Sequence, residues 1–172
     1  MAERGEGPEI LRPARWSYIA LTLALAVSAN LLALPGLAQV LRPDLLALTL
    51  IYWVVYHPRR LGFLPAWILG LIMDVANGSL FGEHALAYAV LMYLSILLYR
   101  RIVMFGMIQQ MLHVLAILIA SQAVMLAVRS AAGADFPGIA YFVPSLLGAI
   151  LWPVLFALIR MPLRPRPGAD VA

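Results

Sequence analysis

Six apolar runs separated by short polar segments constrain the fold of this chain more than any other feature. They are, in order, Trp16–Leu34, Leu45–Tyr56, Gly62–Gly78, His84–Tyr99, Met107–Val128 and Ile139–Ile159. Hydrophobic residues make up 64% of the 172 residues and charged residues only 12%, which is typical of a membrane protein. Because a helix needs about 20 apolar residues to cross a bilayer, we expect an all-α integral membrane protein, a six-transmembrane-helix bundle.

The second and last runs depart from a simple span. The run Leu45–Tyr56 would cover only about 18 Å of a hydrocarbon layer about 30 Å thick, so either it tilts within the protein or flanking residues extend it. In the last run, Pro144 and Pro153 predict kinks.

The arginines predict the orientation of the chain. Six spans place ten arginines on the side of the two termini and only Arg42 and Arg129 on the other, so both termini are expected in the cytoplasm. The predicted organisation is a cytoplasmic tail (1–15), a six-span domain (16–160) and a second cytoplasmic tail (161–172). The net charge of +4 sits in groups between apolar runs, which indicates topology and not a nucleic-acid partner.

One carboxylate, Asp74, interrupts the third run. Gly62, Ala66, Gly70 and Gly78 recur with it at every fourth position, so on a helix they form a stripe of small residues that lets another backbone approach. An ionised Asp facing lipid would cost roughly 3 kcal/mol. We therefore expect Asp74 to point into the protein, to accept hydrogen bonds from a neighbouring helix, and to make this span the central one.

Other chemistry finds little support in the residues. Ser79 and His84 are close in sequence but lack nucleophile-elbow spacing, and His84, His113 and Asp74 show no metal-ligand spacing. Cysteine is absent, which excludes thiol catalysis and thiolate metal sites. We expect no catalytic, cofactor or metal site, with a functional role for Asp74 beyond packing left open.

Five further residues are assigned from their positions. Asp44 follows Arg-Pro and is predicted to cap the second helix. Tyr52, Trp53 and Tyr56 are predicted to form an aromatic belt at the membrane interface, or otherwise a partner-docking surface. His113 is predicted to be a hydrogen-bonded core histidine.

An ordered set of short motifs resembles one known family. The motifs are Arg42-Pro43-Asp44, Tyr52-Trp53, Gly62, Ala66, Gly70-Leu71, Asp74, Gly78, Gly82, His84-Ala85-Leu86 and Arg100-Arg101. Together they resemble the rod shape-determining protein MreD family, over the segment from residue 42 to about residue 101. Outside this segment, the chain resembles the family only in the number and the length of its spans.

This resemblance implies a non-enzymatic subunit of the bacterial inner membrane without a cofactor. The subunit would bind MreC and, through the cell-elongation complex, MreB, RodA and a penicillin-binding transpeptidase, and would support lateral peptidoglycan synthesis and rod cell shape. The resemblance also implies contact with membrane lipids. The candidate structural or partner-binding residues are Arg42, Asp44, Tyr52, Trp53, Gly62, Ala66, Gly70, Asp74, Gly78 and His84.

The family is also similar in fold to the substrate-binding S components of energy-coupling-factor vitamin transporters, which supplies an alternative function. A vitamin binder should hold its ligand among polar groups of the outer loops, whereas the shape protein should have a collapsed or lipid-filled interior. The few polar groups expected in the outer halves favour the shape protein. A lipid-linked wall precursor as ligand is a third alternative.

Overall fold

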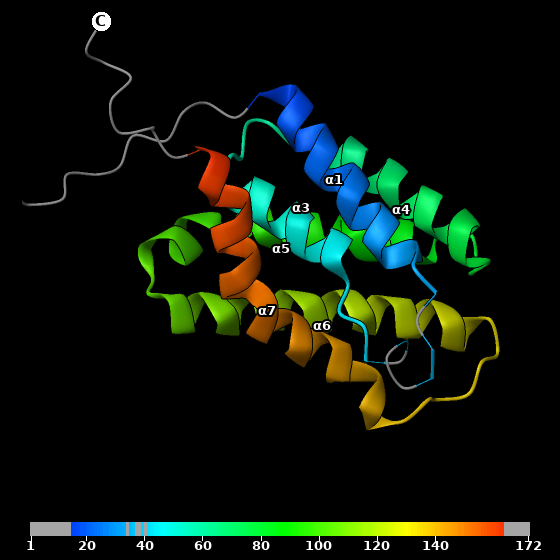
Figure 1. The fold of residues 1–172 in the computed structure, drawn as a ribbon. Helices are drawn as coiled ribbons and strands as arrows, with labels where there is room; N and C mark the ends of the chain where they lie inside the picture. Colours follow the sequence, from blue (N-terminus) through cyan, green and yellow to red (C-terminus); the bar gives the residue numbers. More distant parts are fainter. Residues whose placement is uncertain (1–14, 34, 37–38, 40, 164–172) are drawn as a thin grey trace, which may run out of the picture.

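The computed structural model describes residues 15–33, 35–36, 39 and 41–163, and all of its regular secondary structure is helical. This part of the chain forms six α-helices and two short 3₁₀ helices, and Figure 1 shows how the helices are arranged. Their bounds are α1 (Trp16–Leu31), α3 (Leu45–Tyr56), α4 (Phe63–Asn77), α5 (Glu83–Met104), α6 (Met107–Ala131), η1 (Ile139–Phe142), α7 (Val143–Arg160) and η2 (Met161–Leu163).

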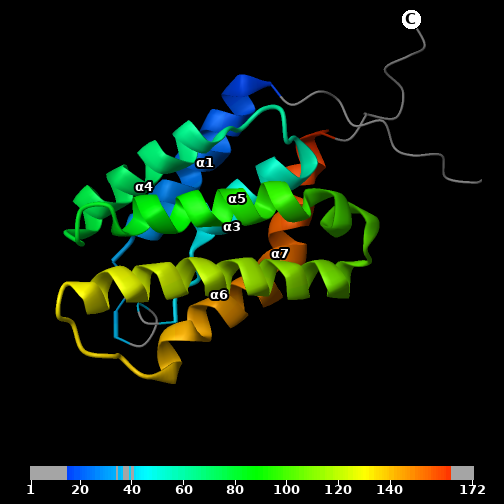
Figure 2. The same ribbon diagram turned by 180° about the vertical axis from the view of Figure 1, so that it is seen from behind.

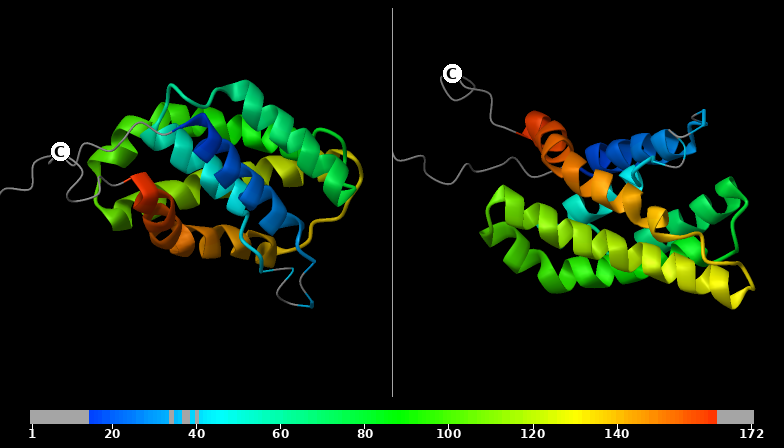
Figure 3. Two further views of the ribbon diagram at one scale, coloured as in Figure 1. Left: turned by 45° about the horizontal axis from the view of Figure 1, so that its top comes forward. Right: turned by 90° about the horizontal axis from the view of Figure 1, so that it is seen from below.

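The helices pair in three layers, as Figures 1 and 2 show from opposite sides. The middle layer holds α3 and α5, which pack against each other; α1 covers α3 and α4 covers α5 on one side. On the other side α6 packs against α5, and α7 packs against α6 and α3. Figure 3 shows the same neighbours from two further directions.

The central helix is α3, formed by the shortest apolar run. Every residue from Leu46 to Val55 is buried. A helix that is apolar all round is a buried helix, which accounts for its position between α1, α5 and α7. The expectation that the third run is central was wrong: α4 buries only Ala66, Gly70, Met73 and Asp74, because its other faces carry exposed apolar side chains.

The predicted aromatic belt was also wrong, because its residues lie in the core. Tyr52 and Trp53 are 1% and 0% exposed. The Trp53 indole Nε1–H donates to Thr22 Oγ1 at 2.9 Å, and the Tyr56 hydroxyl donates to Gln110 Oε1 at 2.9 Å. Buried Trp and Tyr need such partners for their polar atoms, so these rings join helices to one another instead of meeting the membrane surface.

By length and apolarity, three helical segments could cross a membrane: Glu83–Met104, Met107–Ala131 and Ile139–Leu163. The other three apolar helices, α1, α3 and α4, have 16, 12 and 15 residues, fewer than the number a lone span usually needs. All six carry apolar sequence. Length therefore supports three of the six predicted spans.

Pro144 and Pro153 occupy different kinds of position in α7. Pro144 lies in the first turn of α7, directly after η1, where its missing N–H breaks no hydrogen bond of α7. Pro153 is inside the helix. Past α7 the packed chain continues to Leu163, which is buried. The predicted tails fall almost wholly on residues 1–14 and 164–172, outside the described residues.

Candidate functional site

The two ends of the bundle differ in charge. We call the end where α1, α4 and α6 finish and α3, α5 and α7 begin the acidic end, because Asp44, Asp74 and Glu83 lie there. The opposite, arginine end carries Arg59, Arg60, Arg100, Arg101 and Arg160. At the arginine end, burial and then the charge of Arg60 lower the pKa of His57, so this imidazole is neutral at pH 7.

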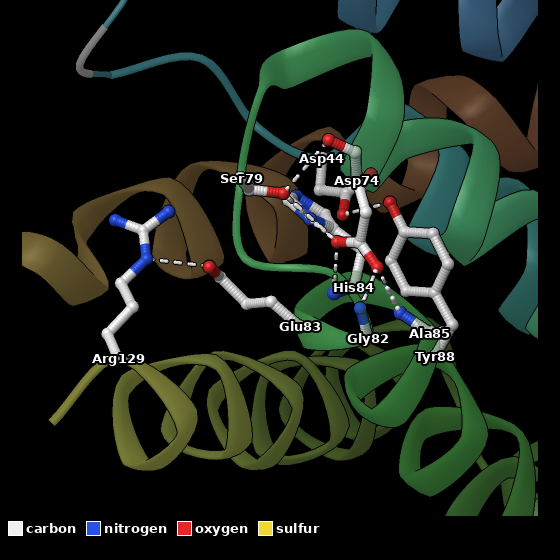
Figure 4. Close-up of polar contacts among 9 residues, drawn as sticks. All are labelled: Asp44, Asp74, Ser79, Gly82, Glu83, His84, Ala85, Tyr88 and Arg129. Atoms are coloured by element: carbon white, nitrogen blue, oxygen red, sulfur yellow. Dashed lines mark hydrogen bonds and ion pairs between the residues drawn. The ribbon is translucent and has the colours of Figure 1, made fainter. Parts of the chain in front are cut away.

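Asp74 joins the end of α4 to the beginning of α5, as Figure 4 shows. Its carboxylate is buried and accepts the backbone N–H groups of Gly82 at 2.8 Å and His84 at 2.7 Å. The Ser79 hydroxyl donates to it at 3.0 Å, and Nδ1 of His84 lies 2.8 Å from it. The prediction that Asp74 accepts hydrogen bonds from a neighbouring helix is confirmed.

The reason for this contact is the missing cap of α5. The residue at the N-cap, Gly82, has no side chain to accept the free N–H groups of the first turn. Asp74 supplies that acceptor from another helix, and its negative charge lies at the positive end of the α5 dipole. Gly78, with φ +61°, ends α4, and Gly82, with φ +98°, completes the turn that brings the two helices together.

Only the middle residues of the small-residue stripe are buried, as predicted for the whole stripe. Ala66, Gly70 and Asp74 are buried, and a Cβ on Gly70 would lie 2.4 Å from the backbone Cα of Ala85, so α4 and α5 touch there backbone to backbone. Gly62 and Gly78 were wrongly assigned to the contact: both are exposed, with open space where a Cβ would stand.

A second carboxylate, Asp44, joins three helices. It accepts the N–H of Ala47 at 2.9 Å, which confirms the predicted cap of α3. It also accepts Asn30 Nδ2 of α1 at 2.7 Å and the Tyr88 hydroxyl of α5 at 2.8 Å. The sequence analysis missed both partners. The sequence did contain a signal for them, because Asn30 and Tyr88 each place a hydrogen-bonding group inside an apolar run.

Two arginines stand near these carboxylates. NH1 of Arg42 donates to the carbonyl of Leu32 at 2.7 Å, just after α1. Nε of Arg129, near the end of α6, donates to Glu83 Oε1 at 2.6 Å. Glu83 is the first residue of α5 and 1% exposed. Its partner was also missed, since the two residues are far apart in sequence.

Ser79, His84 and Asp74 meet, but not as a catalytic triad. The Ser79 hydroxyl lies 3.3 Å from Nδ1 of His84, the same nitrogen that faces Asp74. In a triad the acid and the nucleophile contact opposite ring nitrogens, so that the histidine can take the nucleophile's proton. The hydroxyl here donates to the Asp74 carboxylate instead. The arrangement suits capping and not nucleophile activation.

His113 lies far from this cluster in α6. Its Nδ1 is 2.7 Å from the carbonyl oxygen of Gln109, one turn earlier in the same helix, and its side chain is half-buried. The predicted hydrogen bond is therefore confirmed, although it ties the ring to its own helix, but the predicted place in the core was wrong. Among the described residues no group of three or more His, Cys, Asp or Glu residues could hold a metal ion.

A polar cavity of about 450 Å³ opens among the helix ends at the acidic end. Its walls include Arg42, Asp44, His84, Gln122 and Arg129, with Met73, Leu118 and Met125 as apolar parts. The expectation of few polar groups at this end was wrong. The sequence spreads these residues over four separate segments, and only the antiparallel packing of the helices brings them together.

The sequence model of the family described as "rod shape-determining protein MreD" matches residues 12–162. The chain belongs to the MreD family. It is 31% identical over 153 residues to the rod shape-determining protein MreD of Haemophilus influenzae. The aligned residues cover 85% of this chain and 90% of that protein. No solved structure matches significantly. The resemblance seen in the motifs is thus confirmed, and the chain is a rod shape-determining membrane protein.

Proposed function

We propose that this MreD family protein is a non-catalytic, six-span subunit of the inner membrane that binds MreC and so supports lateral peptidoglycan synthesis. Family membership carries the proposal. The bundle supports it, since two of its carboxylates, Asp44 and the buried Asp74, are used to join helices. MreB, RodA and a penicillin-binding transpeptidase would be reached through MreC and the rest of the complex.

A groove between α1 and α7 suits a membrane helix as partner. It has a volume of about 460 Å³ and lies over α3. Its rims carry exposed leucines, among them Leu25 (61%) and Leu158 (63%), and small Ala26 and Ala29 line it. Small residues let a second helix approach closely, and packing of this kind drives helix association in lipid.

The polar atoms of the groove need nothing from a ligand. The hydroxyl of Thr22 donates to the carbonyl of Ile19, and that of Thr49 donates to the carbonyl of Leu45. The remaining lining is almost entirely apolar. We therefore propose that the transmembrane helix of MreC occupies this groove, and that lipid tails fill it when MreC is absent.

Photo-crosslinking should locate that contact. We expect a benzophenone amino acid at Leu25 or Leu158 to form adducts with MreC in native membranes, because both side chains project from the groove. The same probe at Leu112, 60% exposed on α6, is the matched control and should give lipid adducts alone. Adducts to MreC from Leu112 but not from the groove would contradict the assignment.

The six-span topology makes its own prediction. Reporter fusions after residues 38, 80 and 134 should read as periplasmic, and fusions after residues 59, 102 and 168 as cytoplasmic. The physical reason is the excess of arginine at the arginine end. Residues 38 and 168 lie outside the described part of the chain. A single inverted reporter would overturn the assignment of spans.

One observation favours the alternative, an S component of a vitamin transporter: the polar cavity at the acidic end. That function would require a tightly held vitamin and docking on a coupling subunit. Affinity purification from native membranes, with mass spectrometry of proteins and small molecules, separates the two. Recovery of MreC supports the shape protein, and recovery of a vitamin with transporter subunits supports the alternative.

A further inference from the structure

The cavity at the acidic end is large enough for a ligand and is not explained by MreC binding. Its volume of about 450 Å³ falls in the range of small-molecule sites, about 300–1,000 Å³. It lies at the ends of the helices, away from the groove between α1 and α7 that the proposed function uses. The inference below therefore goes beyond that function and does not depend on it.

The carboxylates around the cavity already have hydrogen-bond or ion-pair partners within the protein. Asp44 accepts from Asn30, Ala47 and Tyr88. Behind the wall, Asp74 accepts from the first turn of α5, and Glu83 accepts from Arg129. All three carboxylates lie at the N-terminal end of α3 or α5, where the helix dipole also offsets their charge.

The guanidinium groups, by contrast, have donors to spare. Arg42 uses one N–H on the carbonyl of Leu32, and Arg129 uses its Nε–H on Glu83; the described residues offer them no other hydrogen-bond acceptor. Both side chains are half-buried and line the same cavity. Planar guanidinium forks match the oxygens of carboxylate and phosphate groups.

We propose that this cavity binds a small anionic molecule, whose carboxylate or phosphate group lies between Arg42 and Arg129. The amide of Asn77 and the hydroxyl of Tyr141, which also line the cavity, can bond to polar groups in the rest of the molecule. Met73, Leu118 and Met125 form an apolar wall for its carbon skeleton. The anion comes from a free solute or from a phospholipid headgroup, which share this chemistry.

The test uses the full chain, purified in dodecyl maltoside, a detergent that carries no phosphate or carboxylate group. Thermal unfolding is followed during titration with inorganic phosphate, with succinate, and with dihexanoyl phosphatidic acid, each against sodium chloride at equal ionic strength. We expect at least one of these anions to raise the unfolding temperature saturably. Stabilisation by phosphate or succinate identifies a free solute, and stabilisation by the short-chain lipid alone identifies a headgroup. No stabilisation by any of the three overturns the proposal.

Two variants test the residues. Arg42→Gln should weaken binding about tenfold, as expected for a lost charge-assisted hydrogen bond, whereas Arg101→Gln, the same change on an exposed arginine of the other end, should not. The double variant Glu83→Gln/Arg129→Gln keeps a polar pair in place of the ion pair. It should also weaken binding about tenfold, and it provides the test of the site if Arg42→Gln does not fold. Unchanged binding in the cavity variants would overturn the proposal.

Discussion

Gly70→Ala should be the most damaging single-methyl change in this protein. The added Cβ would lie 2.4 Å from the Cα and 2.6 Å from the N of Ala85, and neither backbone atom can move without separating α4 from α5. Overpacking of this kind costs about 3 kcal/mol. We expect a lower unfolding temperature in mild detergent, measured by tryptophan fluorescence, and reduced accumulation in the membrane.

Gly62→Ala is the matched control for that prediction. It makes the same chemical change four residues before Ala66, at the N-cap of α4, where nothing lies within 4 Å of the added Cβ and φ is −97°. Its unfolding temperature should match that of the wild type. Equal destabilisation by the two alanines would show that the contact between α4 and α5 does not limit stability.

The second large effect is expected for Asp74→Leu. The change leaves the N–H groups of Gly82 and His84, and the Ser79 hydroxyl, without their acceptor at the start of α5. Hydrogen bonds within membrane proteins contribute about 0.6 kcal/mol each on average and about 1.7 kcal/mol at most, so the loss of three costs about 2–5 kcal/mol. We expect lower steady-state levels and a weaker pull-down of MreC.

His113→Leu is the comparison for Asp74→Leu, since it also replaces a polar side chain within a membrane helix. It removes one bond to the carbonyl of Gln109 in the same helix, so it should cost less than about 1 kcal/mol. Asp74→Asn, which keeps one acceptor oxygen, should lie between the two. Equal levels and unchanged MreC recovery for Asp74→Leu would contradict a role for the carboxylate in joining α4 to α5.

The sequence predicted the helical class, the membrane setting, the cap at Asp44 and the inward orientation of Asp74, because none of these depends on which helices are neighbours. Apolar runs of suitable length indicate helices, and Asp44 after Arg-Pro caps the following helix whatever that helix packs against. Asp74 was inferred to face the protein because the cost of exposing it to lipid does not depend on the fold.

What the sequence could not predict depends on which helices are neighbours. Tyr52 and Trp53 were placed at the interface because aromatic residues near the end of an apolar run usually lie there, but burial of α3 on all sides overrides that tendency. The ion pair of Glu83 with Arg129 and the bond from Tyr88 to Asp44 join helices far apart in the chain. No spacing rule connects such residues.

The burial of α3 bears on how the protein is made. A helix of 12 residues spans about 18 Å, too short to hold its place across a bilayer alone when it leaves the translocon. We expect α3 to reach its final position only after α5 has been synthesised and can pack against it. Insertion of the first half of the chain therefore depends on synthesis of the second half. A ribosome stalled before residue 104 should therefore leave α3 accessible to water-soluble labels.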